Sequence, residues 1–215
     1  MYAAPQSVKG AIPGPGDSRY NGGMILSLAF LMACAPHLYT DATQDSACSP
    51  SLAPENSWPS AEELPCDVGG TGFQTGQVPP ELVAPDQTGA TVSLWQFFGH
   101  VTVVDISTMW CAPCQDLAHG VQATADAFAA DGLVYVTVLP ENIHNEVPTV
   151  DDLAYWANSF HITSPVLSDG ENWYAGAVVE ASFPQVMVLN ERLEICKRDI
   201  AANDAAVEAA IESCL

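Results

Sequence analysis

A short β-branched segment that runs into a Cys-x-x-Cys motif constrains the fold of this chain more than any other feature. Residues 101–106 have the Val and Ile content typical of a buried central strand. Cys111 and Cys114 follow, and apolar residues then recur at helical spacing until Gly132, a residue that commonly ends helices. The cysteine pair is therefore predicted to lie where a helix begins after a central strand.

This placement has chemical consequences for the two thiols. The first turn of a helix offers unpaired N–H groups and the positive end of the helix dipole, which stabilise a thiolate. Cys111 is predicted to be the exposed nucleophile and Cys114, one turn further in, the resolving thiol. Pro113 suits the first turn because it has no N–H to lose. Asp105, six residues before Cys111 on the predicted strand, could carry the proton of Cys114; the alternative is an ordinary strand-end acid.

A structural zinc site is the competing interpretation of the motif. Zinc takes four ligands, usually from two closely spaced pairs. This chain has one such pair, and the histidines after residue 77 are scattered: His100, His119, His144 and His161. We therefore expect a redox-active disulfide with no metal and no added cofactor.

Strand and helix signals alternate from residue 78 to the C-terminus. Segments 81–83 and 91–94 flank a turn-forming cluster at 85–89, which predicts a hairpin. Further strands are expected at 133–139, 185–189 and 193–197, a helix is expected to begin at Thr149, and a last helix should carry Val207, Ile211 and Cys214. The pattern indicates an α/β domain with a central sheet.

The charge balance excludes several classes of partner. Five Lys and Arg residues stand against 26 Asp and Glu, a net charge of −21. Nucleic acid is excluded because phosphate binding needs a basic face, and anionic membrane surfaces are disfavoured for the same reason. No Lys or Arg lies between Tyr20 and Glu191, so that stretch holds no Arg-based phosphate clamp.

The N-terminal part predicts export. Residues 24–33 form an apolar run that is too short to span a membrane but matches the core of a signal peptide. Residues 31–34 resemble the lipobox of bacterial lipoproteins, which implies a signal peptide at 1–33 and lipidation of Cys34. A plain secretory signal and a buried helix are the alternatives, and translation could begin at Met1 or Met24. Residues 34–77 are rich in Pro, Ser and Gly, as in a tether or irregular extension before a domain at 78–215.

The cysteine count bears on the same prediction. The chain has seven cysteines, and lipidation of Cys34 would leave an even number that can pair. Cys48 with Cys66 and Cys196 with Cys214 are each 18 positions apart, so proximity predicts them as structural disulfides among 15 possible connectivities. Such disulfides require an oxidising compartment.

The residues around the motif resemble the thioredoxin superfamily, in particular its exported TlpA/ResA-like and redoxin (AhpC/TSA-related) branch. That pattern is a strand with an Asp followed by Trp-Cys-x-Pro-Cys, matched here by Asp105, Trp110, Cys111, Pro113 and Cys114. The resemblance covers about residues 78–215. It implies a thioredoxin fold, with a central mixed sheet flanked by helices and an N-terminal hairpin extension.

The resemblance extends to residues 182–189, which are similar to a later strand of the family. The proline before that strand is cis in the family and faces the cysteine pair, and Pro184 would take this role. A peroxiredoxin would require Pro-x-x-x-Thr-x-x-Cys; Thr108 fits, but Val104 occupies the proline position. The glutamate that cytochrome-maturation members often carry shortly after the pair is also missing, since Gln115 and Asp116 follow Cys114 directly.

The resemblance implies a membrane-tethered thiol–disulfide oxidoreductase that faces the periplasm or exterior of a bacterium. We expect it to reduce disulfides of exported proteins with electrons from an upstream thiol donor. The Ala-Pro dipeptide between the cysteines has no histidine, and Asp105 and Asp116 add negative charge that opposes a thiolate. These features predict a reductant rather than an oxidant. The alternatives are a thiol peroxidase of the peroxiredoxin type and a non-enzymatic thioredoxin-fold module for binding or metal handling.

Overall fold

A five-stranded mixed sheet lies at the centre of the structure, a computed structural model that describes residues 54–178 and 182–215. The strand order is β5-β4-β3-β6-β7. The strands are β3 (Thr102–Ile106), β4 (Val134–Leu139), β5 (Val166–Ser168), β6 (Gln185–Leu189) and β7 (Ile195–Lys197). β3, β4 and β5 run parallel, whereas β6 is antiparallel to β3 and β7 is antiparallel to β6. The predicted mixed central sheet is confirmed.

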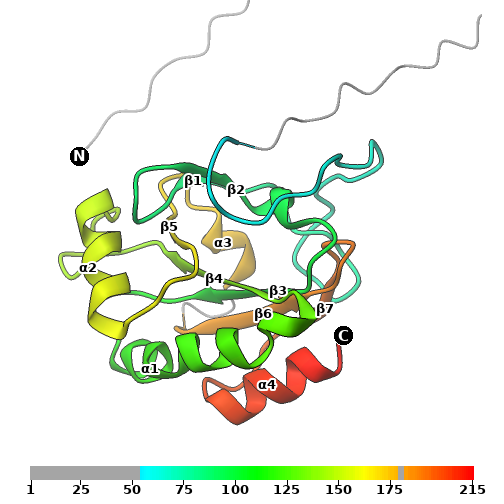
Figure 1. Cartoon of the computed structure of the whole chain (residues 1–215). Helices are drawn as coiled ribbons and strands as arrows, with labels where there is room; N and C mark the ends of the chain where they lie inside the picture. The colour runs from blue at the N-terminus through cyan, green and yellow to red at the C-terminus, as the bar shows by residue number, and fades with distance from the viewer. Residues whose placement is uncertain (1–53, 179–181) are drawn as a thin grey trace, which may run out of the picture. The chain divides into compact units, whose positions relative to one another are not determined.

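Helices and 3-10 turns cover both faces of this sheet (Figure 1). They are η1 (Leu94–Phe97), α1 (Ala112–Ala127), η2 (Ala129–Asp131), α2 (Val150–Phe160), α3 (Tyr174–Ala177) and α4 (Asp204–Glu212). The helix after the cysteines leads through η2 to Gly132, whose φ of 77° lies in the left-handed region that glycine tolerates. α2 begins where predicted, because Thr149 and Asp152 form a reciprocal capping box.

Alternation along the strands divides the apolar residues between two cores. On one face Val103 and Tyr135 belong to a core that also includes residues of α1, α2 and α4. On the other face Val104 and Val136 pack in a core with the β1–β2 hairpin, η1 and α3. Figure 1 shows α1 and α4 on one side of the sheet and β1, β2 and α3 on the other. The sheet is thus buried on both faces.

The predicted hairpin is present as a separate two-stranded sheet of β1 (Val83–Pro85) and β2 (Thr91–Ser93). Ala84 pairs with Val92. β1 begins two residues later than expected and continues to the edge of the turn. The buried side chain of Asp86 organises that turn, since one carboxylate oxygen accepts from the backbone N–H groups of Thr88, at 2.7 Å, and Ala90, at 3.0 Å.

The described part of the predicted tether, residues 54–77, packs against the domain. It contains no helix or strand, as expected of an irregular extension, but Trp58, Val68 and Phe73 contact the core that holds the hairpin. Trp58 Nε1 donates to Asp86 Oδ2 over 2.6 Å, and the ring of Phe73 lies edge-on to that of Trp173 with 5.0 Å between centroids. The folded unit therefore begins before residue 78.

The predicted signal peptide, Cys34 and Cys48 lie outside the described residues. Within the described ranges, no helix has the length and apolar character needed to cross a membrane.

Three details of the C-terminal half differ from expectation. β5 and α3, of three and four residues, were not predicted. β7 begins at Ile195 rather than at residue 193, because Leu193 adopts a φ of 62° in the turn that joins β6 to β7. α4 ends at Glu212, so Cys214 lies just beyond the helix.

Candidate active site

Cys111 and Cys114 are joined by a disulfide at the N-terminus of α1. Cys111 is the N-cap residue, and its sulfur accepts a hydrogen bond from the backbone N–H of Cys114 at 3.3 Å. Pro113 lies in the first turn, as expected. The sulfur that would become a thiolate on reduction is thus directed at the unpaired N–H groups of the helix.

The two cysteines differ in accessibility. Cys114 is fully buried, and Cys111 has an exposed fraction of 5%. Cys111 is therefore the outer of the two, but it is less exposed than the sequence suggested, because the carbonyl oxygen of Phe183 lies 3.6 Å from its sulfur. The Phe183–Pro184 peptide bond is cis, which is the geometry that the family resemblance implied. The loop before β6 thereby borders the disulfide.

Trp110 forms the exposed rim beside the pair. Its side chain is 46% exposed, and its ring lies edge-on to Phe183 with centroids 6.1 Å apart. Its indole Nε1 donates to Glu141 Oε2 over 2.7 Å, and the backbone N–H of Met109 donates to the Glu141 carbonyl. The loop after β4 therefore holds the segment that leads into the cysteines.

Asp105 lies on β3 beneath the start of α1 and is completely buried. Burial raises the pKa of Asp105 to about 7, although a hydrogen bond of 2.7 Å from Ser107 Oγ to Oδ1 lowers it. Its other oxygen, Oδ2, has no hydrogen-bond partner among the described residues. A carboxyl with this pKa changes protonation state near neutral pH, as a group that exchanges protons with a thiol must.

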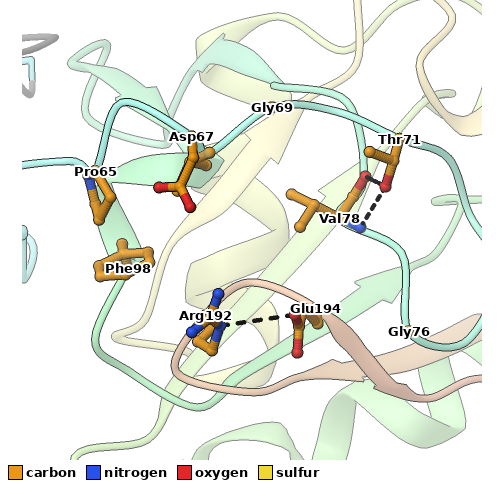
Figure 2. Close-up of a pocket in the computed structure, with 10 residues that line it drawn as sticks. Pro65, Asp67, Gly69, Thr71, Gly76, Val78, Phe98, Arg192 and Glu194 are labelled. Atoms are coloured by element: carbon orange, nitrogen blue, oxygen red, sulfur yellow. Dashed lines mark hydrogen bonds and ion pairs between the residues drawn. The ribbon is translucent and has the colours of Figure 1, made fainter. Parts of the chain in front are cut away.

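Two cavities lie away from the disulfide itself. A cavity of about 400 Å³ lies between residues 65–78 and the turn from β6 to β7, where Arg192 forms an ion pair with Glu194 at 3.6 Å (Figure 2). Phe98, which precedes β3, also lines it, whereas Cys111 follows the opposite end of that strand. A smaller cavity of about 180 Å³ adjoins the rim of the disulfide site, since its lining includes Glu141 and Tyr174, whose ring centroid lies 5.9 Å from that of Phe183.

Two of the three basic residues in the described ranges have partners away from the cysteines, and the third, Lys197, lies on the edge strand β7. Arg192 pairs with Glu194, and Arg198 contacts Asp199 and the carbonyl oxygen of Phe73. Neither pairing involves the cysteines. No group of three or more His, Cys, Asp or Glu side chains within the described ranges is placed to hold a metal ion.

The remaining cysteines of the described chain lie apart from this pair. Cys196 on β7 is disulfide-bonded to Cys214 after α4, which is the pairing that proximity predicted. Cys66 is also disulfide-bonded, and its predicted partner, Cys48, lies outside the described residues.

Sequence reasoning missed two side chains around the pair, Glu141 and Ser107. Glu141 reaches Trp110 from a loop 31 residues away, and no local pattern marks it, whereas the resemblance had already implied that the segment with Phe183 and Pro184 borders the pair. Ser107 was within reach of sequence reasoning, because it follows Asp105 by two residues on one buried segment.

Comparison with known proteins agrees with this geometry. The model of the AhpC/TSA family matches residues 75–190, more than half of the chain. A search of the curated proteins finds no match.

Solved structures show the same fold at low identity. The thioredoxin domain of a thiol-disulfide oxidoreductase from Bacteroides vulgatus is 18% identical with a TM-score of 0.55, covering 66% of this chain and 97% of that one. A thioredoxin-family thiol:disulfide interchange protein from Chlorobium tepidum is 13% identical with the same TM-score and the same coverage. Peroxidoxin BcpB from Mycobacterium tuberculosis is 18% identical, with a TM-score of 0.55 and coverage of 66% and 96%.

The family match, the strand order and the disulfide at the start of α1 lead to one assignment. Thioredoxin-like redoxins typically use a redox-active cysteine pair and need no added cofactor. The chain belongs to the AhpC/TSA family and has a thioredoxin fold, with a disulfide between Cys111 and Cys114 where α1 begins.

Proposed function

We propose that this protein reduces disulfides of exported proteins through its Cys111–Cys114 dithiol. In the reduced protein, the Cys111 thiolate attacks one sulfur of the substrate disulfide, and the other substrate sulfur leaves as a thiolate. Cys114 then gives its proton to Asp105 and attacks the Cys111 sulfur. This second step releases the substrate as a dithiol and leaves the pair as a disulfide, so two electrons pass to the substrate. An upstream thiol donor restores the dithiol.

The observation that carries this proposal is the arrangement around the Cys111 sulfur. The sulfur accepts from a backbone N–H of the helix, and it lies 3.6 Å from the carbonyl oxygen of Phe183. Trp110 and the loop containing Phe183 form an apolar rim against which an extended substrate segment could lie. The buried Asp105 supplies a proton acceptor that works near neutral pH.

The electrostatics favour a reductant. Strong oxidants of this type stabilise their reduced form by holding a cysteine as a very acidic thiolate. Among the described residues, Arg192 and Arg198 each pair with an acidic side chain, and Arg198 also donates to a backbone carbonyl. Neither arginine is paired with a cysteine. The helix terminus is then the main stabilisation of the thiolate. We infer a couple on the order of −270 mV, near the value for thioredoxin.

Peroxide reduction is the second candidate function, because the family match and the similarity to peroxidoxin BcpB both allow it. The family's proline is replaced by Val104, which is fully buried on β3. Thr108 is also buried, and its hydroxyl has no hydrogen-bond partner among the described residues. Because Val104 replaces the proline of the peroxiredoxin motif, we rank peroxide reduction below disulfide reduction.

We also propose that the protein is exported and held at a bacterial membrane by lipid on Cys34. The support is the lipobox-like sequence at residues 31–34 and the odd number of cysteines. Mass spectrometry of the mature N-terminus tests this part. A diacylglyceryl adduct on an N-terminal Cys34 is expected, whereas an unmodified Cys34 or cleavage elsewhere contradicts the anchor.

An insulin-reduction assay with peroxide consumption measured beside it separates the functions. The wild-type protein should precipitate insulin in the presence of dithiothreitol, and C111S should be inactive. The double variant C196S/C214S is the matched control, because it removes a disulfide outside the proposed site and should keep the activity. Peroxide consumption without insulin reduction would favour the peroxidase, and absence of both would favour a binding module.

A further inference from the structure

Asp105 and Thr137 form an isolated polar pair on the sheet face beneath α1. The two residues are directly opposite each other in the parallel β3–β4 ladder. Their outer neighbours in the same row are apolar: Val186 of β6 is opposite Asp105, and Val166 of β5 is opposite Thr137. Both members of the pair are completely buried. The row therefore offers each of them a polar neighbour on one side only.

Both residues have a polar atom with no hydrogen-bond partner among the described residues: Asp105 Oδ2 and Thr137 Oγ1. A buried carboxylate oxygen or hydroxyl without a hydrogen-bond partner destabilises the fold, so two such atoms on facing residues call for a common explanation. Adjacent strands lie about 4.8 Å apart, a gap that two hydrogen bonds of about 2.8 Å can bridge through one water.

We propose that Thr137 is a positioning residue for Asp105, and that its hydroxyl and Asp105 Oδ2 together hold one buried water that leads toward Cys114. Cys114 packs in the core on this same face, together with Val186 and with Leu139, the next residue of β4 to point that way. This inference rests on the proposed role of Asp105 in disulfide reduction.

The chemistry of the step is a proton transfer. As Cys114 attacks the mixed disulfide, its S–H proton passes to the water, and the water gives a proton to Asp105 Oδ2. The carboxyl becomes neutral and the water is regenerated, so no other reactant is consumed. When the carboxylate is charged, a donor held at Oδ2 stabilises it, just as Ser107 does at Oδ1.

Among residues 54–178 and 182–215, few other titratable groups face this pair. Tyr135 lies one pleat away on β4 and interacts electrostatically with Asp105 and with Asp204 of α4, and its pKa is raised well above the ordinary value mainly by burial. It therefore stays neutral across the working range. The other groups are the Cys111 and Cys114 thiols of the reduced protein at the start of α1.

The test compares T137V and T137S in the full-length protein. The Asp105 carboxyl is titrated by carbon-13 NMR in the oxidised protein, and mixed-disulfide resolution with an oxidised peptide is followed by acid quench and mass spectrometry. T137V should raise the titration midpoint, because the donor to the charged form is lost, and should slow resolution about tenfold. T137S keeps the hydroxyl and should restore both.

T102V is the matched control. Thr102 is an equally buried threonine of β3, but it belongs to the alternate set that faces the other core, and its hydroxyl donates to the His100 carbonyl. A wild-type midpoint in T137V, or equal shifts in T137V and T102V, would overturn the proposal. The proposed role of Asp105 fails if D105N resolves mixed disulfides at the wild-type rate. The NMR titration needs no substrate, so it still tests whether Thr137 affects the Asp105 carboxyl in that case.

Discussion

The indole of Trp110 donates a hydrogen bond of 2.7 Å to the carboxylate of Glu141. This contact links the loop before α1 to the loop after β4, and it orients the exposed ring beside the disulfide. It also places the negative charge of Glu141 at the rim of the site. Glu141 lines the neighbouring cavity as well, together with Glu146 and Asp169.

Replacing Glu141 by Ala should weaken substrate reduction without affecting the thiols. Loss of a hydrogen bond to a charged acceptor at this half-exposed position costs about 1 kcal/mol, so kcat/KM for a peptide disulfide should fall about fivefold. E146A is the control, because Glu146 lies in the same loop but its side chain is exposed. Equal rates in E141A and E146A would show that the Trp110 orientation is irrelevant to turnover.

Alkylation should distinguish the roles of the two cysteines. In the reduced protein at pH 7, iodoacetamide should label Cys111 first, because Cys114 is fully buried and only the Cys111 sulfur caps the helix. C114S should accumulate mixed disulfides at Cys111 in cells. Peptide mapping that found Cys114 labelled first would reverse the assignment.

Asp105 should make stability depend on pH. Its pKa is about 7 in the folded protein and near 3.8 in the unfolded chain, so the folded state binds more protons between these values. The free energy of unfolding should therefore fall as pH rises from about 4 to about 7. D105N has no carboxyl to deprotonate at this position. The difference in free energy of unfolding between D105N and the wild type should therefore be larger at pH 8 than at pH 4, by up to about 4 kcal/mol in favour of D105N.

Urea unfolding of both proteins at the two pH values measures this difference. A D105N variant with the same advantage at pH 4 and pH 8 would mean that the carboxyl does not titrate in this range.

The disulfide between Cys196 and Cys214 should stabilise the domain without taking part in turnover. It closes a loop of 18 positions and ties the end of α4 to β7. The chain-entropy estimate for such a loop is about 3 kcal/mol. C196S/C214S should lose about that much in urea unfolding and keep the insulin-reducing activity at 25 °C; a large loss of activity in a folded variant would assign this disulfide a redox role.

Elements with a local signal were predictable from the sequence. The β-branched run of β3, the helical spacing after Cys114 and the Thr149 capping box each specify structure within a few residues. β5 and α3 are too short for a periodic signal, so they were missed.

Packing between distant segments was not predictable. Trp58 and Phe73 are isolated aromatic residues in a Pro- and Gly-rich stretch, and only the folded domain offers them an apolar surface. The same reason applies at the site: the sequence indicated Cys111, Asp105 and, through the resemblance, the cis bond before Pro184. Glu141 reaches Trp110 through a loop whose path depends on the whole sheet.

Equilibration of the Cys111–Cys114 pair with glutathione tests the central claim most directly. The fraction of reduced protein is measured by thiol trapping across a series of reduced-to-oxidised glutathione ratios at pH 7. The expected potential is on the order of −270 mV, since the helix terminus stabilises the thiolate and no basic side chain of the described ranges is paired with the cysteines. A potential above about −180 mV, the value of an isomerase, would contradict a reductant.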